Sequence, residues 1–367
     1  MQGEKLNRRD VLRSAGSIIL ASSVGRDVLA DSRAAPGIPP LKWGFVGTGA
    51  ISNHMAKHIA TTPLATLTAV SSRSMASARA FADLHGITLA FDDWKDMCEA
   101  DDVDGIYVAT PTGVREEIAV YAARAGKHVL AEKPFASVAS VQRIVAACRD
   151  SDVAFMDGTR FVHHPRTHAL KRDMPANTGR PLSIASAFQF ALPDRRNIRY
   201  DARLEPMGAI GDAGWYNLRA TVEYLAPGTE PVSVSAVLRR DETSETVIAG
   251  AGVIQMNDGS TATWNCAYDV GGSVMDCVIA GRQGTVRVDN FLRQDPDHSA
   301  TYHYFRGGSG PDAEVVRRIE SNQLDGARMF DTFAAIAADA SLRDEWATAT
   351  LRTQRLLDAS WASAFSG

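Results

Sequence analysis

Two short segments of the chain, AEKP and GDAGWY, carry side chains that could exchange a proton with a ligand. Lys133 directly precedes Pro134 at the end of an apolar run, and its ammonium could donate to a ligand oxygen and stabilise an alkoxide. Tyr216 carries a phenol with an ordinary pKa of about 10, which the positive charge of Lys133 is expected to lower. Asp212 comes four residues earlier, on the same face of a helix, where it could orient a ligand or tune the lysine. These types predict proton transfer at a hydroxyl or carbonyl group, with Lys133, Tyr216 and Asp212 as catalytic and substrate-binding residues.

A tight turn with the sequence GTGAIS follows the apolar run LKWGFV at residues 41 to 46. Apolar residues then recur at helical spacing, which predicts a strand, a turn and a helix. Gly47 can adopt backbone angles closed to other residues, and Gly49 lets the main chain approach a pyrophosphate at the positive end of the helix. The third glycine of the dinucleotide fingerprint is absent, so a purely structural turn fits the same letters. The residues expected to hold a dinucleotide here are Gly47, Thr48, Gly49, Ala50 and Ile51.

The next strand, TLTAVSSRS at residues 66 to 74, bears on the choice between NAD and NADP. It ends about 20 residues after the turn, where an acidic residue would bind the ribose 2′-hydroxyl of NAD. Ser72 and Arg73 stand there in place of an Asp or Glu, and both can donate hydrogen bonds to a 2′-phosphate. The sequence therefore favours NADP over NAD.

Strands and helices keep alternating through the first half of the chain. Helices are expected at residues 75 to 85 and 113 to 125, and strands at 104 to 110 and 128 to 134. This alternation predicts a parallel, doubly wound sheet, which binds ligands at the carboxyl ends of its strands. The further residues expected beside the cofactor at this edge are Thr110, Pro111, Glu132 and Lys133.

The hydrophobic period changes to two in the second half of the chain. Segments at 182 to 192, 232 to 237 and 260 to 268 alternate apolar and polar residues, which predicts a largely antiparallel sheet with one buried face. Two helical segments, at 322 to 339 and 342 to 363, are expected to close the chain. The fold class is therefore α/β: a Rossmann domain at residues 41 to 160, and an α+β domain, expected to bind the substrate, at residues 161 to 367.

Residues 1 to 30 have the features of an export signal. Arg8 and Arg9 precede a short uncharged stretch that is too short to span a bilayer, which needs about 20 apolar residues. The paired arginines resemble a twin-arginine (Tat) signal, with cleavage after Ala30, although a frayed terminal helix would also fit. We expect the Tat machinery to deliver the protein to the periplasm, with residues 31 to 40 as an extended arm because of their prolines.

The composition narrows the choice of partners. The chain has 367 residues, enough for two domains with their own cores. Its 39 basic and 43 acidic residues give a net charge of -4, which offers no electrostatic case for nucleic acid or for an anionic membrane, and no stable membrane insertion is expected. The four cysteines are far apart and form no CxxC pair, so they are expected to be structural thiols. The expected ligand is a small molecule.

Histidines gather in the segment FVHHPRTH. His164 and His168 are one helical turn apart, which is compatible with a metal site, but no carboxylate or thiolate at matching spacing completes one. We therefore expect no metal. Two interpretations stay open for Arg160, His164 and Arg166: polar lining of a substrate pocket, or packing.

Five motifs, taken in this order and spacing, carry a resemblance to a known family: GTGAIS, ATPT, AEKP, FMDGTRFVHHPR and GAIGDAGWY. Together they resemble the Gfo/Idh/MocA family, and most closely its branch of glucose-fructose oxidoreductase and of sugar and dihydrodiol dehydrogenases. The resemblance implies hydride transfer between NAD(P) and a hydroxyl or carbonyl group of a sugar or polyol, and a homodimer or homotetramer. We place this oligomerisation, which the family resemblance implies, on the apolar sheet face of the domain at residues 161 to 367. Thr112 and Arg115 replace the Asn and His that many members have after the fourth strand.

Three functions remain compatible with these residues. The leading one is an exported oxidoreductase that carries tightly bound NADP, since free NADP is not expected outside the cytoplasm, and that recycles it with two sugars. The second is a redox-neutral, NAD-dependent glycosidase, and the third is a cofactor-bound sugar-binding protein without turnover.

Overall fold

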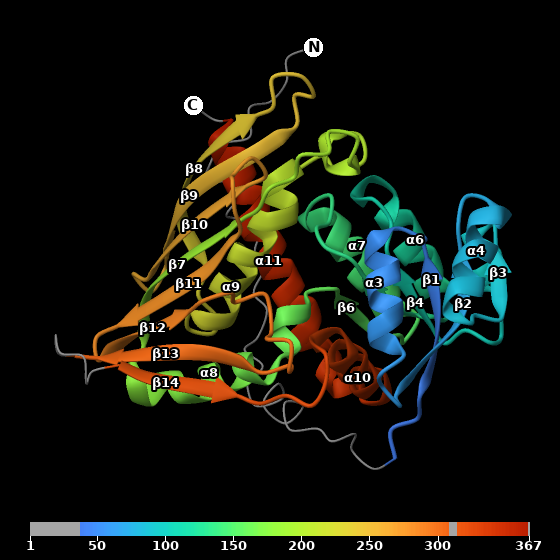
Figure 1. Cartoon of the computed structure of the whole chain (residues 1–367), viewed down its shortest axis with the longest axis horizontal. Helices are drawn as coiled ribbons and strands as arrows, with labels where there is room; N and C mark the ends of the chain where they lie inside the picture. The colour runs from blue at the N-terminus through green and yellow to red at the C-terminus, as the bar shows by residue number, and fades with distance from the viewer. Residues whose placement is uncertain (1–36, 308–313, 366–367) are drawn as a thin grey trace.

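The chain forms two parts that pack against each other (Figure 1). The computed structural model describes residues 37–307 and 314–365, so the proposed export signal lies outside the described residues. The first part is a parallel sheet with helices on both faces, and the second is a larger, mostly antiparallel sheet. The fold class is therefore the one predicted. In the described part of the chain, no helix has the length and apolar character needed to cross a membrane.

The first part is a parallel sheet of six strands in the order β3-β2-β1-β4-β5-β6. Its central strands are buried on both faces, as expected when helices cover both sides of a parallel sheet. The strands are β1 (Leu41–Val46), β2 (Ala65–Ser71), β3 (Leu89–Phe91), β4 (Gly105–Val108), β5 (His128–Ala131) and β6 (Phe155–Asp157). The helices are α3 (Ala50–Ile59), α4 (Met75–His85), α5 (Trp94–Cys98), α6 (Thr112–Arg124) and α7 (Val138–Asp150).

The second part is a sheet of eight strands in the order β14-β13-β12-β11-β7-β10-β9-β8. All of its neighbouring pairs are antiparallel except β10 and β7, which run parallel. The strands are β7 (Pro181–Gln189), β8 (Pro231–Arg240), β9 (Val247–Met256), β10 (Thr261–Ala267), β11 (Val274–Gly281), β12 (Gly284–Val288), β13 (Ala300–Arg306) and β14 (Glu314–Ile319).

Three of the remaining helices, α8 (Pro165–Asn177), α9 (Trp215–Tyr224) and α11 (Arg343–Ala364), pack on the large sheet, and α10 (Asp325–Ala338) packs on the first part. The shorter elements are η1 (Arg160–His163), η2 (Ile198–Tyr200), η5 (Ala340–Leu342) and the π-helical turn η3 (Ile210–Gly214). Helix α11 runs between the two parts (Figure 1) and packs against β6 as well as β8.

The last helices contribute to both parts of the molecule. Helix α10 packs on α3, and its Phe330 ring meets Trp43 of β1 with the ring centroids 5.1 Å apart. A parallel sheet with apolar residues on both faces needs helices on both sides, and α10 supplies part of that cover. The segment predicted to belong wholly to the second domain therefore completes the core of the first.

Local patterns predicted the element positions well where the pattern was long. Helix α4 spans the predicted residues 75 to 85, and Gly126 takes a φ of +76° just after α6, a conformation in which glycine commonly ends a helix. No range was predicted for strands β3, β6, β9, β11, β12, β13 and β14. All four cysteines are buried and free, as expected of structural thiols.

Candidate functional site

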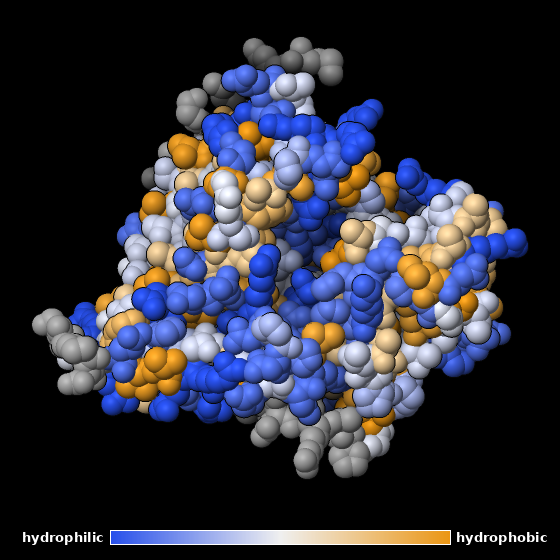
Figure 2. Space-filling model, in the orientation of Figure 1, coloured by the Kyte–Doolittle hydropathy of each residue, from blue (hydrophilic) through white to orange (hydrophobic). Residues whose placement is uncertain are grey.

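A cleft of about 1370 Å³ lies between the two parts of the molecule. Figure 2 shows this hollow, with hydrophilic residues around it. The carboxyl ends of β1, β2, β4 and β5 contribute one wall, and residues of β7, η2 and η3 contribute the other. The cleft exceeds the range of about 300 to 1,000 Å³ that is typical of a single small-ligand pocket. It therefore has room for a dinucleotide and a substrate together.

The glycine-rich turn has the geometry that a pyrophosphate needs. Gly47 has a φ of +104°, and a Cβ there would come within 3.0 Å of the Ala109 carbonyl oxygen, so only glycine fits. Gly49 is the N-cap of α3, and neither a side-chain cap nor an acidic residue in the first turn occupies the helix start. The free N–H groups therefore face a space that suits an anion. All five residues predicted from this turn, Gly47 to Ile51, line the cleft.

The end of β2 also faces the cleft, as predicted. Ser72 and Arg73 line it, and the Ser72 hydroxyl lies 3.3 Å from the Thr48 hydroxyl of the glycine-rich turn. The Arg73 side chain is exposed and has no ion-pair partner among the described residues. Asp92 and Asp93 also line the cleft, which the sequence did not predict, but Asp93 caps α5 by accepting from the Lys95 N–H at 2.8 Å.

Arg115 braces the two loops that carry Thr110 and Lys133. Its side chain is buried, and the guanidinium donates hydrogen bonds to the carbonyl oxygens of Thr110 and Pro134. The residue that replaces the family's histidine therefore ties the end of β4 to the end of β5. Thr110 and Pro111 line the cleft, as predicted.

Lys133 and Asp212 form a buried ion pair at the meeting point of the two parts. The Lys133 ammonium donates to the Asp212 carboxylate at 2.7 Å and to its backbone carbonyl at 3.1 Å. Burial opposes the charged lysine, but the charge of Asp212 outweighs it and raises the pKa of Lys133. Lys133 is therefore a cation at neutral pH.

Two residues that were not predicted complete the surroundings of Asp212. The Arg199 guanidinium donates to both carboxylate oxygens, at 2.6 and 3.2 Å, and the Tyr268 hydroxyl donates at 3.2 Å. Burial alone would favour the neutral acid, but the charges of Lys133 and Arg199 hold the pKa of Asp212 well below its usual range. Asp212 is therefore an anchor for cations and a poor proton acceptor. Because Arg199 and Tyr268 lie far from AEKP in sequence, no local spacing indicated them.

Tyr216 lies beside Lys133, with the ammonium 4.6 Å from the centre of its ring. The predicted lowering of its pKa is wrong. Burial raises the pKa of the phenol above its ordinary value, even though the charges of Lys133 and Arg160 act in the opposite direction. Tyr216 is therefore a protonated phenol at neutral pH, which makes it a proton donor first.

Glu132 lines the cleft but has a partner behind it. Its Oε1 accepts a hydrogen bond from the buried Tyr107 hydroxyl at 2.6 Å. A Cβ on Gly158 would come within 2.8 Å of the same oxygen, so the backbone packs closely there. Glu132 is therefore held rigidly next to Lys133.

The three residues considered for pocket lining separate in the structure. Arg160 lines the cleft, where its Nη1 lies 2.7 Å from His54 Nε2 and 3.7 Å from Asp325. His164 and Arg166 instead pack inside the second part. His164 caps the start of α8 and its Nε2 contacts the His298 carbonyl oxygen at 3.1 Å, while Arg166 donates to the Phe291 carbonyl. Neither residue lines the cleft and both are buried, so their prediction as substrate-binding residues is wrong and the packing interpretation holds for them. No group of metal-binding side chains occurs among the described residues.

The segment between residues 193 and 207 forms part of the cleft wall, in a conformation that local patterns did not predict. Arg196, Ile198 and Glu205 all line the cleft. The Glu205 carboxylate accepts from the Thr112 hydroxyl at 2.7 Å and so links this segment to the start of α6. Thr112 therefore joins the two walls.

Comparison with protein families supports the assignment of both parts. A family model described as "Oxidoreductase family, NAD-binding Rossmann fold" (GFO_IDH_MocA) matches residues 41–159. A second, the GFO/IDH/MocA C-terminal domain, matches residues 176–287.

Individual proteins and solved structures of the same kind are also similar to this chain. The chain is 34% identical over 297 residues to trans-1,2-dihydrobenzene-1,2-diol dehydrogenase of Xenopus laevis, covering 76% of this chain and 88% of the relative. It is 32% identical over 227 residues to dTDP-3,4-didehydro-2,6-dideoxy-alpha-D-glucose 3-reductase of Actinomadura kijaniata, covering 61% and 67%. A crystal structure of a 3-ketoreductase from Actinomadura kijaniata in complex with NADP and TDP-benzene superposes with a TM-score of 0.80 and 26% identity, covering 88% of this chain and 98% of that one.

Proposed function

Because the chain belongs to the Gfo/Idh/MocA oxidoreductase family, we propose that it transfers hydride between NADP and a CH–OH or carbonyl group of a sugar or polyol. The observation that carries this proposal is the joining of the glycine-rich turn, Lys133 and Tyr216 around one cleft. Hydride transfer needs a dinucleotide site next to a group that handles the hydroxyl proton. This cleft supplies both.

The choice of NADP rests on the end of β2. Arg73 is exposed and free of an ion-pair partner among the described residues, so it can bind a 2′-phosphate. The similar 3-ketoreductase structure, which is a complex with NADP, supports the same choice. Arg73→Ala should weaken NADP binding about 10-fold or more and leave NAD binding nearly unchanged, since a hydrogen bond to a charged group contributes about 1.5–3 kcal/mol. Calorimetric titration with each cofactor tests this, and an equal loss for both would remove the case for NADP.

The residues around Lys133 set the roles in the reaction. NADP supplies or accepts the hydride when bound. Lys133 donates hydrogen bonds to the substrate oxygen and stabilises negative charge on it, and Asp212 keeps the ammonium in place. Tyr216 gives its phenolic proton to the oxygen of a carbonyl substrate during reduction, and takes a hydroxyl proton back in the reverse direction.

The cofactor is proposed to stay bound and to be recycled in place. The Tat-type segment at residues 1 to 30 suits export of an already folded chain to the periplasm, where free NADP is not expected. Oxidation of one sugar would then load the hydride, and reduction of a second carbonyl compound would remove it.

The protein is also proposed to form a homodimer or homotetramer. Val237 and Val253 are exposed on the neighbouring strands β8 and β9, with 71% and 50% of their surface accessible. Such apolar side chains on an open sheet face suit a surface that a second copy covers.

Absorbance at about 340 nm, which reports the reduced nicotinamide, tests the function directly. The full chain is loaded with NADP, and single sugars are added one at a time. The absorbance should rise with at least one sugar, and it should fall when a second carbonyl compound is added. Cleavage of a glycoside without net reduction would instead favour the redox-neutral glycosidase, and no change with any sugar would favour a binding protein.

A further inference from the structure

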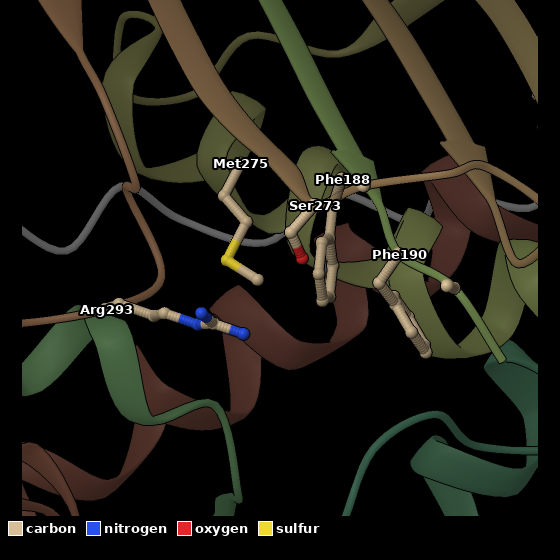
Figure 3. Close-up of a pocket in the computed structure, with 7 residues that line it drawn as sticks. Phe188, Phe190, Ser273, Met275 and Arg293 are labelled. Atoms are coloured by element: carbon tan, nitrogen blue, oxygen red, sulfur yellow. The ribbon is translucent and has the colours of Figure 1, made fainter.

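A side pocket of about 410 Å³ opens from the main cleft (Figure 3). Its lining includes Phe188, Phe190, Ser273, Met275 and Arg293. Phe188, Phe190, Met275 and Arg293 also line the cleft, so the two spaces are continuous. A ligand held at Lys133 can therefore extend into this pocket.

The strand pairing makes one wall of the side pocket apolar. Phe188 of β7 pairs in register with Met275 of β11, and Phe190 lies two residues further along, on the same face of the sheet. The Phe188 and Phe190 rings are 5.2 Å apart, with their planes at 33°, and Figure 3 shows Met275 pointing into the same space. Aromatic rings and a thioether form a favourable lining for a flat ring.

Arg293 supplies a positive charge to this apolar pocket. It lies on the loop after β12 and extends toward the space below Met275 (Figure 3). Its guanidinium makes no side-chain hydrogen bond or ion pair with any residue between 37 and 307 or between 314 and 365. An unpaired guanidinium at a pocket mouth suits a carboxylate or phosphate, which it can bind through two hydrogen bonds.

The side pocket also touches the proton-transfer residues. The Phe188 ring packs edge-on against Tyr216, with the ring centroids 5.6 Å apart. A substituent one ring away from the reacting carbon would therefore reach the pocket while the sugar stays beside Tyr216.

We propose that the side pocket binds an aromatic ring bearing an anionic group, carried as a substituent on the sugar substrate. The ring lies against Phe188, Phe190 and Met275, and the anion pairs with Arg293. This inference rests on the proposed function, since it names the class of substrate that fits the same cleft best: a sugar that bears an acidic aryl group.

A binding experiment that needs no turnover tests the pocket. Benzoate and phenyl phosphate carry the ring with the two kinds of anion, benzyl alcohol carries the ring alone, and acetate carries the anion alone. Each is titrated into the full, NADP-loaded chain, whose methionines are labelled at the methyl group for NMR. The Met275 signal is assigned with Met275→Leu, and Met97, which is fully buried in the first part, serves as the internal control.

Benzoate or phenyl phosphate should shift the Met275 signal and leave the Met97 signal in place. The probe that binds more tightly identifies whether the pocket prefers a carboxylate or a phosphate. Both single-feature probes should bind more weakly, because each makes only half of the contacts.

Arg293→Gln should lower the affinity for the anionic probe about fivefold, as expected for a solvent-accessible ion pair. The affinity for benzyl alcohol should change by less than about twofold. Arg282→Gln, an exposed arginine on the turn between β11 and β12, should change neither affinity.

An unmoved Met275 signal with every probe, or an equal loss of benzyl alcohol and benzoate in Arg293→Gln, would overturn the inference. Neither outcome depends on hydride transfer. If the probes bind as expected while no sugar, with or without an acidic aryl group, changes the absorbance of the cofactor, the proposed function fails and the pocket stands.

Discussion

Asp212 and Asp157 are both buried carboxylates bound to arginine, yet their surroundings differ in one respect. The Asp212 side chain is 14% exposed and lies in the cleft, whereas the Asp157 side chain is 0% exposed. Asp157 accepts from Arg219 at 2.6 Å and from the Thr350 hydroxyl at 2.6 Å. It therefore ties the last strand of the parallel sheet, β6, to α9 and α11.

Both sites hold the pKa of their carboxylate down by similar means. Burial opposes ionisation at Asp157, but the charge of Arg219 and hydrogen bonds from Thr159 and Thr350 outweigh it and lower the pKa. The pKa of Asp212 is held low by two cations, Lys133 and Arg199, and both line the cleft. A shifted pKa therefore does not by itself separate a reactive site from a structural one. What separates the two sites is whether a ligand can reach the carboxylate and its partners.

Lys133, Asp212 and Arg199 form an open cluster at the cleft. The largest expected effect comes from removing its Lys133 cation. Lys133→Met should lower kcat by about 10²- to 10⁴-fold, because the substrate oxygen loses its hydrogen-bond donor and its stabilising charge. Cofactor binding and melting temperature should stay close to those of the unchanged protein. Steady-state kinetics, with bound NADP measured after release from denatured protein, checks both, and near-normal turnover would remove Lys133 from the mechanism.

Asp157, Arg219 and Glu223 form a sealed cluster, whose side chains are buried. A change there should lower stability and leave the turnover of the folded protein unchanged. Arg219→Met leaves Asp157 and Glu223 buried without their partner, which should cost about 3–5 kcal/mol of stability. The fraction that remains folded should keep its kcat. Arg172→Met is the matched control, since this exposed arginine pairs with Asp173 at 3.0 Å and should change stability by less than about 1 kcal/mol. Denaturant unfolding measures the difference, and equal effects of the two variants would show that the sealed cluster does not clamp the parts.

A smaller effect is expected from Arg199, which acts through Asp212. Arg199→Gln should lower kcat about tenfold, by loosening the anchor of Lys133 through lost charge-assisted hydrogen bonds. It should also raise the pKa of Asp212, because one of its two stabilising cations is gone. As the pH falls, Asp212 would then take up its proton earlier, so the acid limb of kcat should move to higher pH. A merely structural role would lower kcat without moving that limb.

The smallest effect is expected from pH itself near neutrality. The raised pKa of Tyr216 keeps its phenol protonated, so the rate of carbonyl reduction should stay flat through neutral pH and fall only above about pH 10. Tyr216→Phe should be slower and should lose this alkaline limb. A fall in the reduction rate between pH 7 and 8 that tracks Tyr216 would show that the cofactor-loaded site lowers the pKa after all.

The sequence predicted the parts of the site that depend on local backbone geometry. Gly47 and Gly49 act through a turn of a few residues, and Lys133 follows a short buried strand, so their types and order were informative. The alternation of strands and helices likewise predicted the parallel sheet, since every unit lies within a short stretch of chain.

Contacts between distant segments could not be derived in this way. Asp212 meets Lys133 across 79 residues, and Thr350 meets Asp157 across 193. The raised pKa of Tyr216 depends on how deeply both walls bury the ring, and the location of His164 depends on the angle at which the chain enters α8. The packing of α10 on the first part has the same origin, because periodicity identifies an apolar face but not the surface that it covers.

A single-turnover measurement tests most directly whether the open cluster takes part in the reaction while the sealed cluster only stabilises the fold. The unchanged chain, Lys133→Met and Arg219→Met are each loaded with NADP, checked for equal occupancy, and mixed with a sugar that reduces the unchanged chain. The absorbance at about 340 nm is then followed. Folded Arg219→Met should react at a normal rate, and Lys133→Met should react at least about 10²-fold more slowly. Equal rates in these two variants would contradict it.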